Sequence, residues 1–160
     1  MDQTTLLRAT SILGFTSSIY LSGIYFSSSH LTLPILYRFP SSTSTSIFEE
    51  FYYRGAITVV PLALFSTLSS GVSAYLQPEK RASFAAAAAL TIGTLAWTRA
   101  AMMRTIEALV GAARDEKVRE KVGENGVVEG LKRWKWMNMV RAGLALAGGV
   151  VGLVAVADGL

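Results

Sequence analysis

Few residues of this 160-residue chain can carry out chemistry. The chain has one histidine, His30, and no cysteine, which excludes disulfides, thiolate metal sites, iron–sulfur clusters and sites built from several histidines. It contains no Glu-x-x-His pair, P-loop, G-x-S-x-G element or G-x-G-x-x-G element. We therefore expect any enzyme built on this chain to use no bound cofactor or metal and to act on a substrate that is itself reactive.

The remaining candidates are polar residues within or beside long uncharged runs, where ionisable side chains are often functional. Arg141 could bind an anionic group of a substrate, pair with an acid such as Glu107, or extend to a nearby membrane interface. His30 could act as a general base near neutral pH, or could simply be a hydrogen-bonded interfacial histidine. Three residues could hydrogen-bond a buried ligand or only neighbouring backbone: Thr98, Thr105 and Asn138.

These candidates lie on four stretches of very low charge. The chain is 51% hydrophobic and 16% charged, against about 25% charged in soluble domains. A membrane-spanning helix needs ~20 mostly apolar residues, so we predict an all-α integral membrane four-helix bundle forming one domain over residues 1–160. The predicted spans are residues 10–36, 55–77, 83–103 and 136–157. The alternative for the first span is a cleaved signal peptide, whose apolar core of about 7–15 residues is shorter than this run.

Lysine and arginine are concentrated on alternate connecting segments, between the first and second spans and between the third and fourth. The positive-inside rule then makes both termini non-cytoplasmic and segment 104–135 cytoplasmic, and we expect the host membrane to be the endoplasmic reticulum. The net charge of +4 thus reports orientation. The basic run with Trp134 and Trp136 resembles a nucleic-acid patch, but its place at the start of a span favours interfacial anchors, so we expect no nucleic-acid partner.

The cytoplasmic segment predicts further helix. Apolar residues at near-helical spacing favour a continuous helix over 104–122, with Asp115 and Arg119 as an i,i+4 pair. Gly123 is expected to end this helix as a left-handed cap. An amphipathic stretch, 127–135, leads back to the membrane as a solvated extension or a partner-binding helix.

Small residues recur at four-residue spacing in three of the spans. In membranes such stripes let helices approach closely, within one chain or between copies in a homo-oligomer. The stripes are Gly14, Ser18 and Ser22; Ala85, Ala89 and Gly93; and Gly148 and Gly152.

Several short motifs follow one another in a recognisable order. They are Gly23 followed by Pro34-Ile35-Leu36; Tyr53-Arg54-Gly55 followed by Pro61; Trp97-Thr98 followed by Met102, Thr105 and Leu109; and Trp134 or Trp136 followed by Asn138 and Arg141. In this order and spacing the chain resembles the small four-helix membrane family that includes the anthrone oxygenases of polyketide pathways. It departs from many relatives at Ile106, where they have asparagine, and at Arg104, where they have proline.

The resemblance implies a monooxygenase that oxidises an anthrone-type polyketide to an anthraquinone with molecular oxygen, without metal or flavin, in secondary metabolite biosynthesis. It implies His30 as the base, with Arg141, Asn138 and Thr98 holding the substrate oxyanion. Tyr53 and Trp97 would stack on a hydrophobic aromatic substrate, and Met102 and Thr105 would complete its binding site. The competing hypothesis is a non-enzymatic membrane scaffold or accessory protein that binds a lipid or a protein partner.

Overall fold

The computed structural model describes residues 2–158, and this part of the chain is helical with no strand. The elements are α1 (Gln3–Ser27), the π-helical segment η1 (Ser28–Thr32), α2 (Leu33–Leu36), α3 (Ser41–Leu76), the 3-10 turn η2 (Pro78–Lys80), α4 (Arg81–Trp97), the π-helical segment η3 (Thr98–Met102), α5 (Met103–Arg114) and α6 (Glu116–Ala157). The all-α prediction is therefore confirmed.

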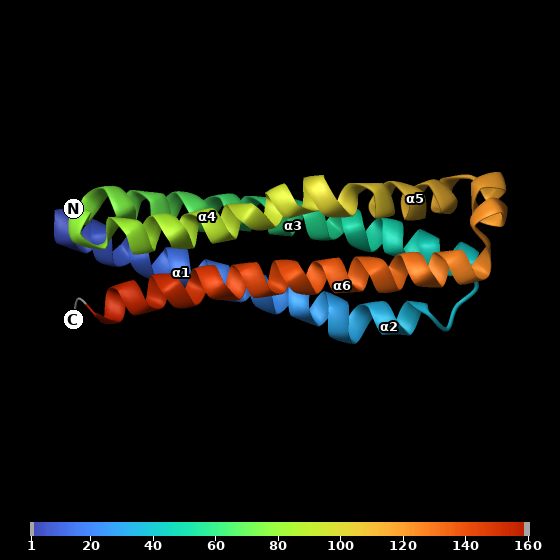
Figure 1. The fold of residues 1–160 in the computed structure, drawn as a ribbon, viewed down its shortest axis with the longest axis horizontal. Coiled ribbons are helices and arrows are strands. Elements are labelled where there is room, and N and C mark those ends of the chain that lie inside the picture. The colour runs from blue at the N-terminus through green and yellow to red at the C-terminus, as the bar shows by residue number, and fades with distance from the viewer. Residues whose placement is uncertain (1, 159–160) are drawn as a thin grey trace.

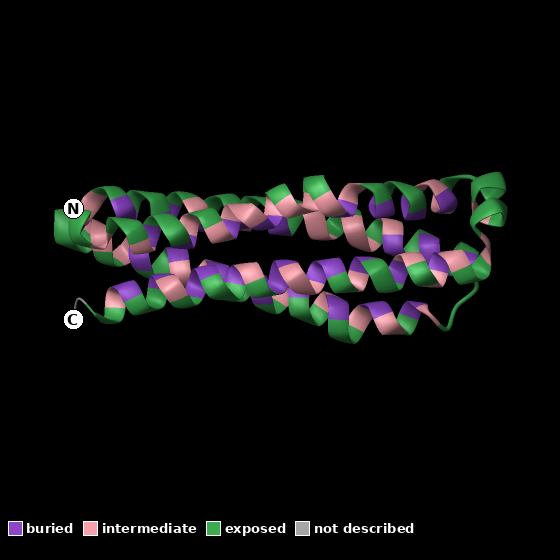
Figure 2. Ribbon diagram, in the orientation of Figure 1, coloured by how far each residue is buried: buried purple, intermediate pink, exposed green. Residues whose placement is uncertain are grey.

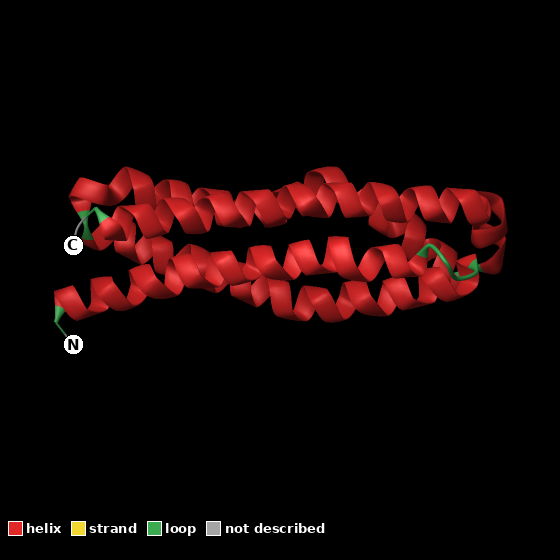
Figure 3. Ribbon diagram, turned by 90° about the horizontal axis from the view of Figure 1, so that it is seen from below, coloured by secondary structure: helices red, strands yellow, loops and turns green. Residues whose placement is uncertain are grey.

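The helices run side by side along the long axis of the molecule (Figure 1). One end holds the N-terminus, the C-terminus and the α3–α4 turn, and the other holds α2, the entry to α3 and the α5–α6 turn. α1 packs against α3 and α6, and α4 packs against the same two helices from the opposite side. The view from below shows the same arrangement, with only short loops between the helices (Figure 3).

Two helices of the described residues, α3 and α6, are long and apolar enough to cross a membrane. At 1.5 Å per residue the 36 residues of α3 extend ~54 Å, more than the ~30 Å of a bilayer core. The predicted spans 10–36 and 83–103 also lie in helical chain. However, α1 is rich in hydroxyl side chains and α4 has 17 residues before η3 interrupts it. The structure thus supports two of the four predicted crossings.

Hydroxyl groups of α1 and α3 join neighbouring helices. Ser18 Oγ donates to the Ala145 carbonyl at 2.8 Å, and Ser22 Oγ donates to the Ala142 carbonyl at 2.8 Å. Others, such as Thr16, bond the carbonyl one turn back in their own helix. Serine and threonine are tolerated in these apolar helices because every such bond satisfies a group that would otherwise be buried unpaired.

Two of the three small-residue stripes are used inside this chain. A Cβ on Gly14 would lie 2.7 Å from Ser70 Oγ, and one on Gly148 would lie 3.0 Å from the Ala87 carbonyl oxygen. These glycines therefore allow close approach between helices of the same molecule. Ala85 and Ala89 are exposed, so the third stripe is the one that faces outward (Figure 2).

The connection between α5 and α6 corrects the predicted continuous helix over 104–122. Asp115 has extended backbone (φ −130°, ψ 120°) and ends α5. Its side chain caps α6 by accepting from the Lys117 N–H at 2.8 Å, while Arg119 pairs with Glu116 at 3.6 Å, so the predicted Asp115–Arg119 pair is absent. Gly123 interrupts α6 with φ 71° and ψ 166°. This conformation is nearly restricted to glycine, but its ψ differs from that of the predicted left-handed cap.

Candidate functional site

A cavity of about 450 Å³ lies between the helices. It is open to the surface on the α3 side, where Arg54, Thr58 and Val60 of its wall are exposed. Its walls come from α1, η1, α3, α4, η3 and α6, and most of the lining is apolar. The wall includes Ile24, Tyr25, Ser28, Phe51, Thr98, Trp134, Asn138 and Arg141. Ligand sites in helical bundles are usually cavities of this kind, with a few polar groups at fixed places.

Three of these polar groups lie on one face of α6. Trp134, Asn138 and Arg141 are spaced by four and three residues, which places them above one another on a helix. Because α6 packs against α1 and α4, this face points into the bundle. All three residues are buried.

Arg141 is held by an amide and an aromatic ring. It is 7% exposed, its Nη1 donates to Asn138 Oδ1 at 3.0 Å, and its Cζ lies 3.9 Å from the centre of the Tyr25 ring. Asn138 is fixed in turn, because its Nδ2 donates to the Tyr25 carbonyl and to Ser29 Oγ, both at 2.9 Å. The predicted alternatives, an ion pair with Glu107 and extension to the interface, do not match this buried position.

The cavity has donors without acceptors. Arg141 Nε and Trp134 Nε1 are both buried, and neither has a hydrogen-bond partner within the described residues. No carboxylate lines the cavity, and the other lining arginine, Arg54, is paired with Glu50 at 2.7 Å on the exposed surface. A buried cation and a free indole N–H with no protein acceptor favour a ligand that brings oxygen acceptors and negative charge.

Both π-helical segments begin at this cavity. Ser28 is the first residue of η1 and Thr98 the first of η3, and both line the cavity. Thr98 Oγ1 donates to the Thr94 carbonyl at 2.8 Å, and Tyr25 Oη donates to Thr94 Oγ1 at 3.4 Å. Segments of π-helix widen a helix locally and occur frequently at functional sites.

Arg141, Asn138 and Thr98, predicted as the oxyanion-binding group, come together at the cavity. His30 does not join them: its side chain is exposed and stacks on Phe26, with ring centres 5.3 Å apart. Tyr53 is 45% exposed and accepts a hydrogen bond from Arg114 Nη2 at 3.2 Å. Neither residue is part of the cavity wall.

The other predicted binding residues pack beside the cavity. Met102 belongs to the largest buried apolar cluster, Thr105 is buried next to it, and Trp97 is half-buried and donates from Nε1 to the Met137 carbonyl at 3.1 Å. Ile106, the departure from the family pattern, lies in the same apolar cluster and does not line the cavity.

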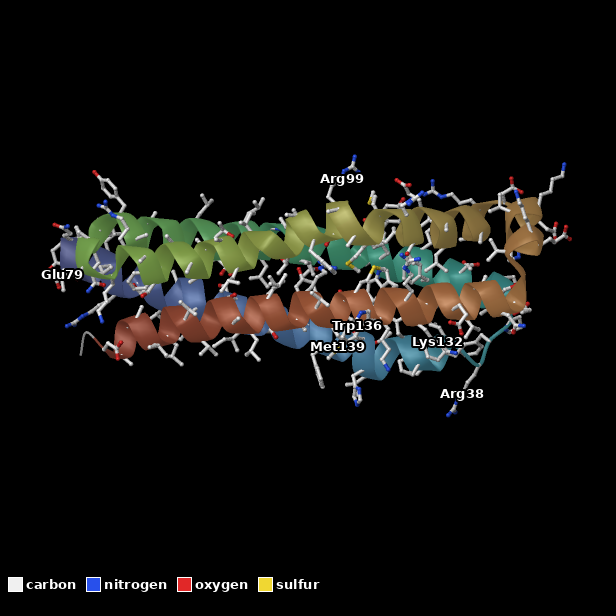
Figure 4. All side chains as sticks on the ribbon, in the orientation of Figure 1. Arg38, Glu79, Arg99, Lys132, Trp136 and Met139 are labelled. Carbon is white, nitrogen blue, oxygen red and sulfur yellow. The ribbon has the colours of Figure 1, made fainter. Side chains whose placement is uncertain are left out.

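Most of the wall lies outside the predicted site, and Trp134 and Tyr25 are the two such residues beside Arg141 and Asn138. The sequence favours an interfacial anchor at Trp134, but its spacing from Asn138 and Arg141 places it on their face of the helix. Tyr25 carries no motif signal and is brought in only by the packing of α1 against α6. Other basic side chains lie outside the cavity: Figure 4 shows Arg99 and Arg38 extending away from the bundle.

Comparison with known proteins gives one match. The model of a protein family described as Anthrone oxygenase matches residues 48–151, more than half of the chain. This region includes α6 residues 134, 138 and 141 and most of the cavity wall from α3, whereas α1 lies outside it. No curated protein and no solved structure is significantly similar to the chain. Within residues 2–158, no group of His, Asp and Glu side chains is suited to hold a metal ion.

Proposed function

The chain belongs to the anthrone oxygenase family, and from this premise we propose that it is a membrane-bound, cofactor-free oxygenase. Its substrate is an anthrone-type polyketide, which it oxidises to an anthraquinone with molecular oxygen in secondary metabolism. The observation that carries the proposal is the buried Arg141 side chain, whose Nε has no hydrogen-bond partner in the described chain and which lines a largely apolar cavity that has no carboxylate in its wall.

The chemistry of an anthrone suits this cavity. Its CH₂ group is acidic, because the anion left after proton loss is delocalised onto the carbonyl oxygen, which becomes a phenolate. Arg141 stabilises that oxyanion, as fixed donors in a desolvated site stabilise developing charge. The Trp134 side chain forms part of the wall, and the apolar walls hold the ring system.

Oxygen then reacts with the bound anion. The electron-rich carbon transfers electrons to O₂ and forms a carbon–oxygen bond. One oxygen atom becomes the new carbonyl oxygen, and the other leaves as water with the two hydrogens of the CH₂ group. The substrate supplies all the electrons, so the balance requires no further reductant.

Proton removal is assigned to water or hydroxide. His30, the base implied by the family resemblance, has its ring outside the cavity. Because Arg141 lowers the free energy of the anion, a weak base suffices to form it. Asn138 and Thr98 take positioning roles, Asn138 through its hydrogen bond to Arg141.

We further propose that all four helical rods cross the membrane, with both termini non-cytoplasmic and the host membrane that of the endoplasmic reticulum. The uncharged runs of the sequence and the exposed apolar side chains along α1, α3 and α6 support this placement. The cavity then lies near the cytoplasmic boundary of the hydrocarbon core.

The proposal is tested with the full chain in liposomes supplied with a hydroxylated anthrone and oxygen. We expect quinone formation and oxygen uptake, in equal molar amounts, well above the spontaneous rate in empty liposomes. Incorporation of a single ¹⁸O atom from ¹⁸O₂ into the quinone would identify a monooxygenase. No excess rate in a folded preparation would refute the oxygenase and leave the accessory-protein alternative.

A further inference from the structure

We propose that the cavity opens sideways into the lipid phase between α1–η1 and α3, and that Gly23 keeps this entrance open. The proposal rests on the proposed function, since it concerns how the substrate reaches the same cavity. It also specifies the substrate class: a flat, uncharged polycycle that is dissolved in the bilayer and becomes an anion only once bound.

The first observation is a groove on the outer side of α1. It is formed by Ile19, Tyr20, Gly23 and Ser27 of α1, with Thr32 of η1 and Phe51 of α3. Three residues, Ile24, Ser28 and Phe51, line both this groove and the cavity described above. The two hollows therefore adjoin one another at these three side chains.

The second observation is the chemistry of the groove. Its lining contains no charged residue, and all of its residues except Phe51 lie in the predicted span 10–36. Tyr20 at its rim is 65% exposed. A side chain of this kind on the outside of an apolar helix faces lipid, so a molecule in the groove is exchanged with the bilayer more readily than with water.

The third observation concerns Gly23. A Cβ built on this residue meets no heavy atom within 4 Å. Close helix packing therefore does not explain the glycine here, in contrast to Gly14 and Gly148. A large side chain at position 23 would occupy the groove without displacing a neighbouring helix.

The wall between the hollows is suited to open. Ser28 begins the π-helical segment η1, where the regular helical hydrogen bonding is altered. Ile24 and Phe51 are only half-buried apolar side chains, which can change rotamer without breaking a hydrogen bond. Entry from lipid then requires side-chain motion and no helix separation.

The experiment compares Gly23→Phe with Gly71→Phe. Gly71 is also exposed, and a Cβ there also meets nothing within 4 Å, but it lies on α3 away from both hollows. The probe is a hydroxyanthraquinone preloaded in liposomes, and its association with each protein is followed by quenching of tryptophan fluorescence. This fluorescence measurement does not depend on catalytic turnover.

We expect Gly23→Phe to slow association by about ten-fold or more, and Gly71→Phe to stay within about two-fold of the wild type. Gly23→Ala and Gly23→Val should give a graded series, and Ser27→Phe should act in the same direction from a second position. Circular dichroism melting of each variant verifies that it is folded.

The outcomes separate the two proposals. Association that depends on Gly23 without any anthrone oxidation by the wild type supports the entrance and refutes the oxygenase. Oxidation by the wild type with equal association rates for folded Gly23→Phe and wild type refutes the entrance alone. Failure of the wild-type protein to bind the probe also refutes the entrance.

Discussion

Replacing Arg141 by methionine should separate the effect of this residue on catalysis from its effect on stability. Methionine has a similar length and keeps the apolar contacts of the side chain, but it removes the cation and the free Nε. Loss of one preorganised donor to an oxyanion lowers the rate by about 10²–10³, which corresponds to about 2.7–4 kcal/mol. We expect a loss of this size for Arg141→Met.

Stability should change much less. The variant loses the hydrogen bond from Nη1 to Asn138, worth about 1.5–3 kcal/mol for a charged donor. It also loses the stacking of Arg141 on Tyr25, worth about 2 kcal/mol in a desolvated place. Against this, the several kcal/mol needed to bury a cation without a counter-charge are regained. The free energy of unfolding should therefore change by less than about 2 kcal/mol.

The assay is the rate of quinone formation in liposomes as a function of pH. If Arg141 stabilises the substrate anion, its removal should raise the apparent pKa of the bound anthrone by about two to three units, because each unit corresponds to about 1.36 kcal/mol. Alkaline pH should then partly restore activity to Arg141→Met. Arg99→Met is the matched control, since Arg99 is exposed and points away from the bundle. Equal rates for Arg141→Met and wild type at neutral pH would refute the reasoning, as would an equal loss in the control.

Three further predictions concern His30, Asn138 and Glu124. His30→Ala should retain wild-type activity because its ring lies outside the cavity; a large loss in the oxygen-uptake assay would restore His30 as the base. Asn138→Asp should lose activity although Arg141 remains, because a carboxylate would neutralise the cation; activity near that of the wild type would contradict this. Glu124 accepts hydrogen bonds from the Ser41 hydroxyl and N–H, which hold the pKa of its carboxyl below the ordinary value of 4.5. Glu124→Gln should therefore melt at a lower temperature than the wild type at neutral pH, and the difference should shrink as the pH falls below about 4.5; a difference independent of pH would be the contrary result.

The helices could be predicted from the sequence because it contains long runs without charged residues. Runs of ~20 such residues match the length of a membrane-spanning helix. The uncharged runs through Leu21, Val59 and Ala145 all lie in helix, and these three side chains face the core. The face of α6 that carries Asn138 and Arg141 could also be predicted, since spacings of three and four residues fix side chains on one side of a helix.

The other features of the fold and of the site depend on contacts between segments that are distant in the sequence. Nothing local marks Thr98 as the start of a π-helical segment, because such a segment is selected by packing. Asp115 could equally have continued the helix, and its side chain instead caps the next one. His30 follows Tyr25 by five residues, which places it on another side of the helix. The helical periodicity could therefore have predicted that His30 points outward.

The hydrogen-bond partner of Arg141, which is Asn138, connects the fold to the proposed chemistry. A carboxylate would have been the more stabilising neighbour for a buried guanidinium, but it would have cancelled the positive charge toward any ligand. Asn138 offers an amide oxygen, and its two bonds to the Tyr25 carbonyl and Ser29 orient that oxygen toward Arg141. The cation is thereby positioned without being neutralised. A buried, oriented and uncompensated charge costs stability, and binding of an anion is the event that repays this cost, which is why we regard the cavity as a site for an anionic form of the substrate.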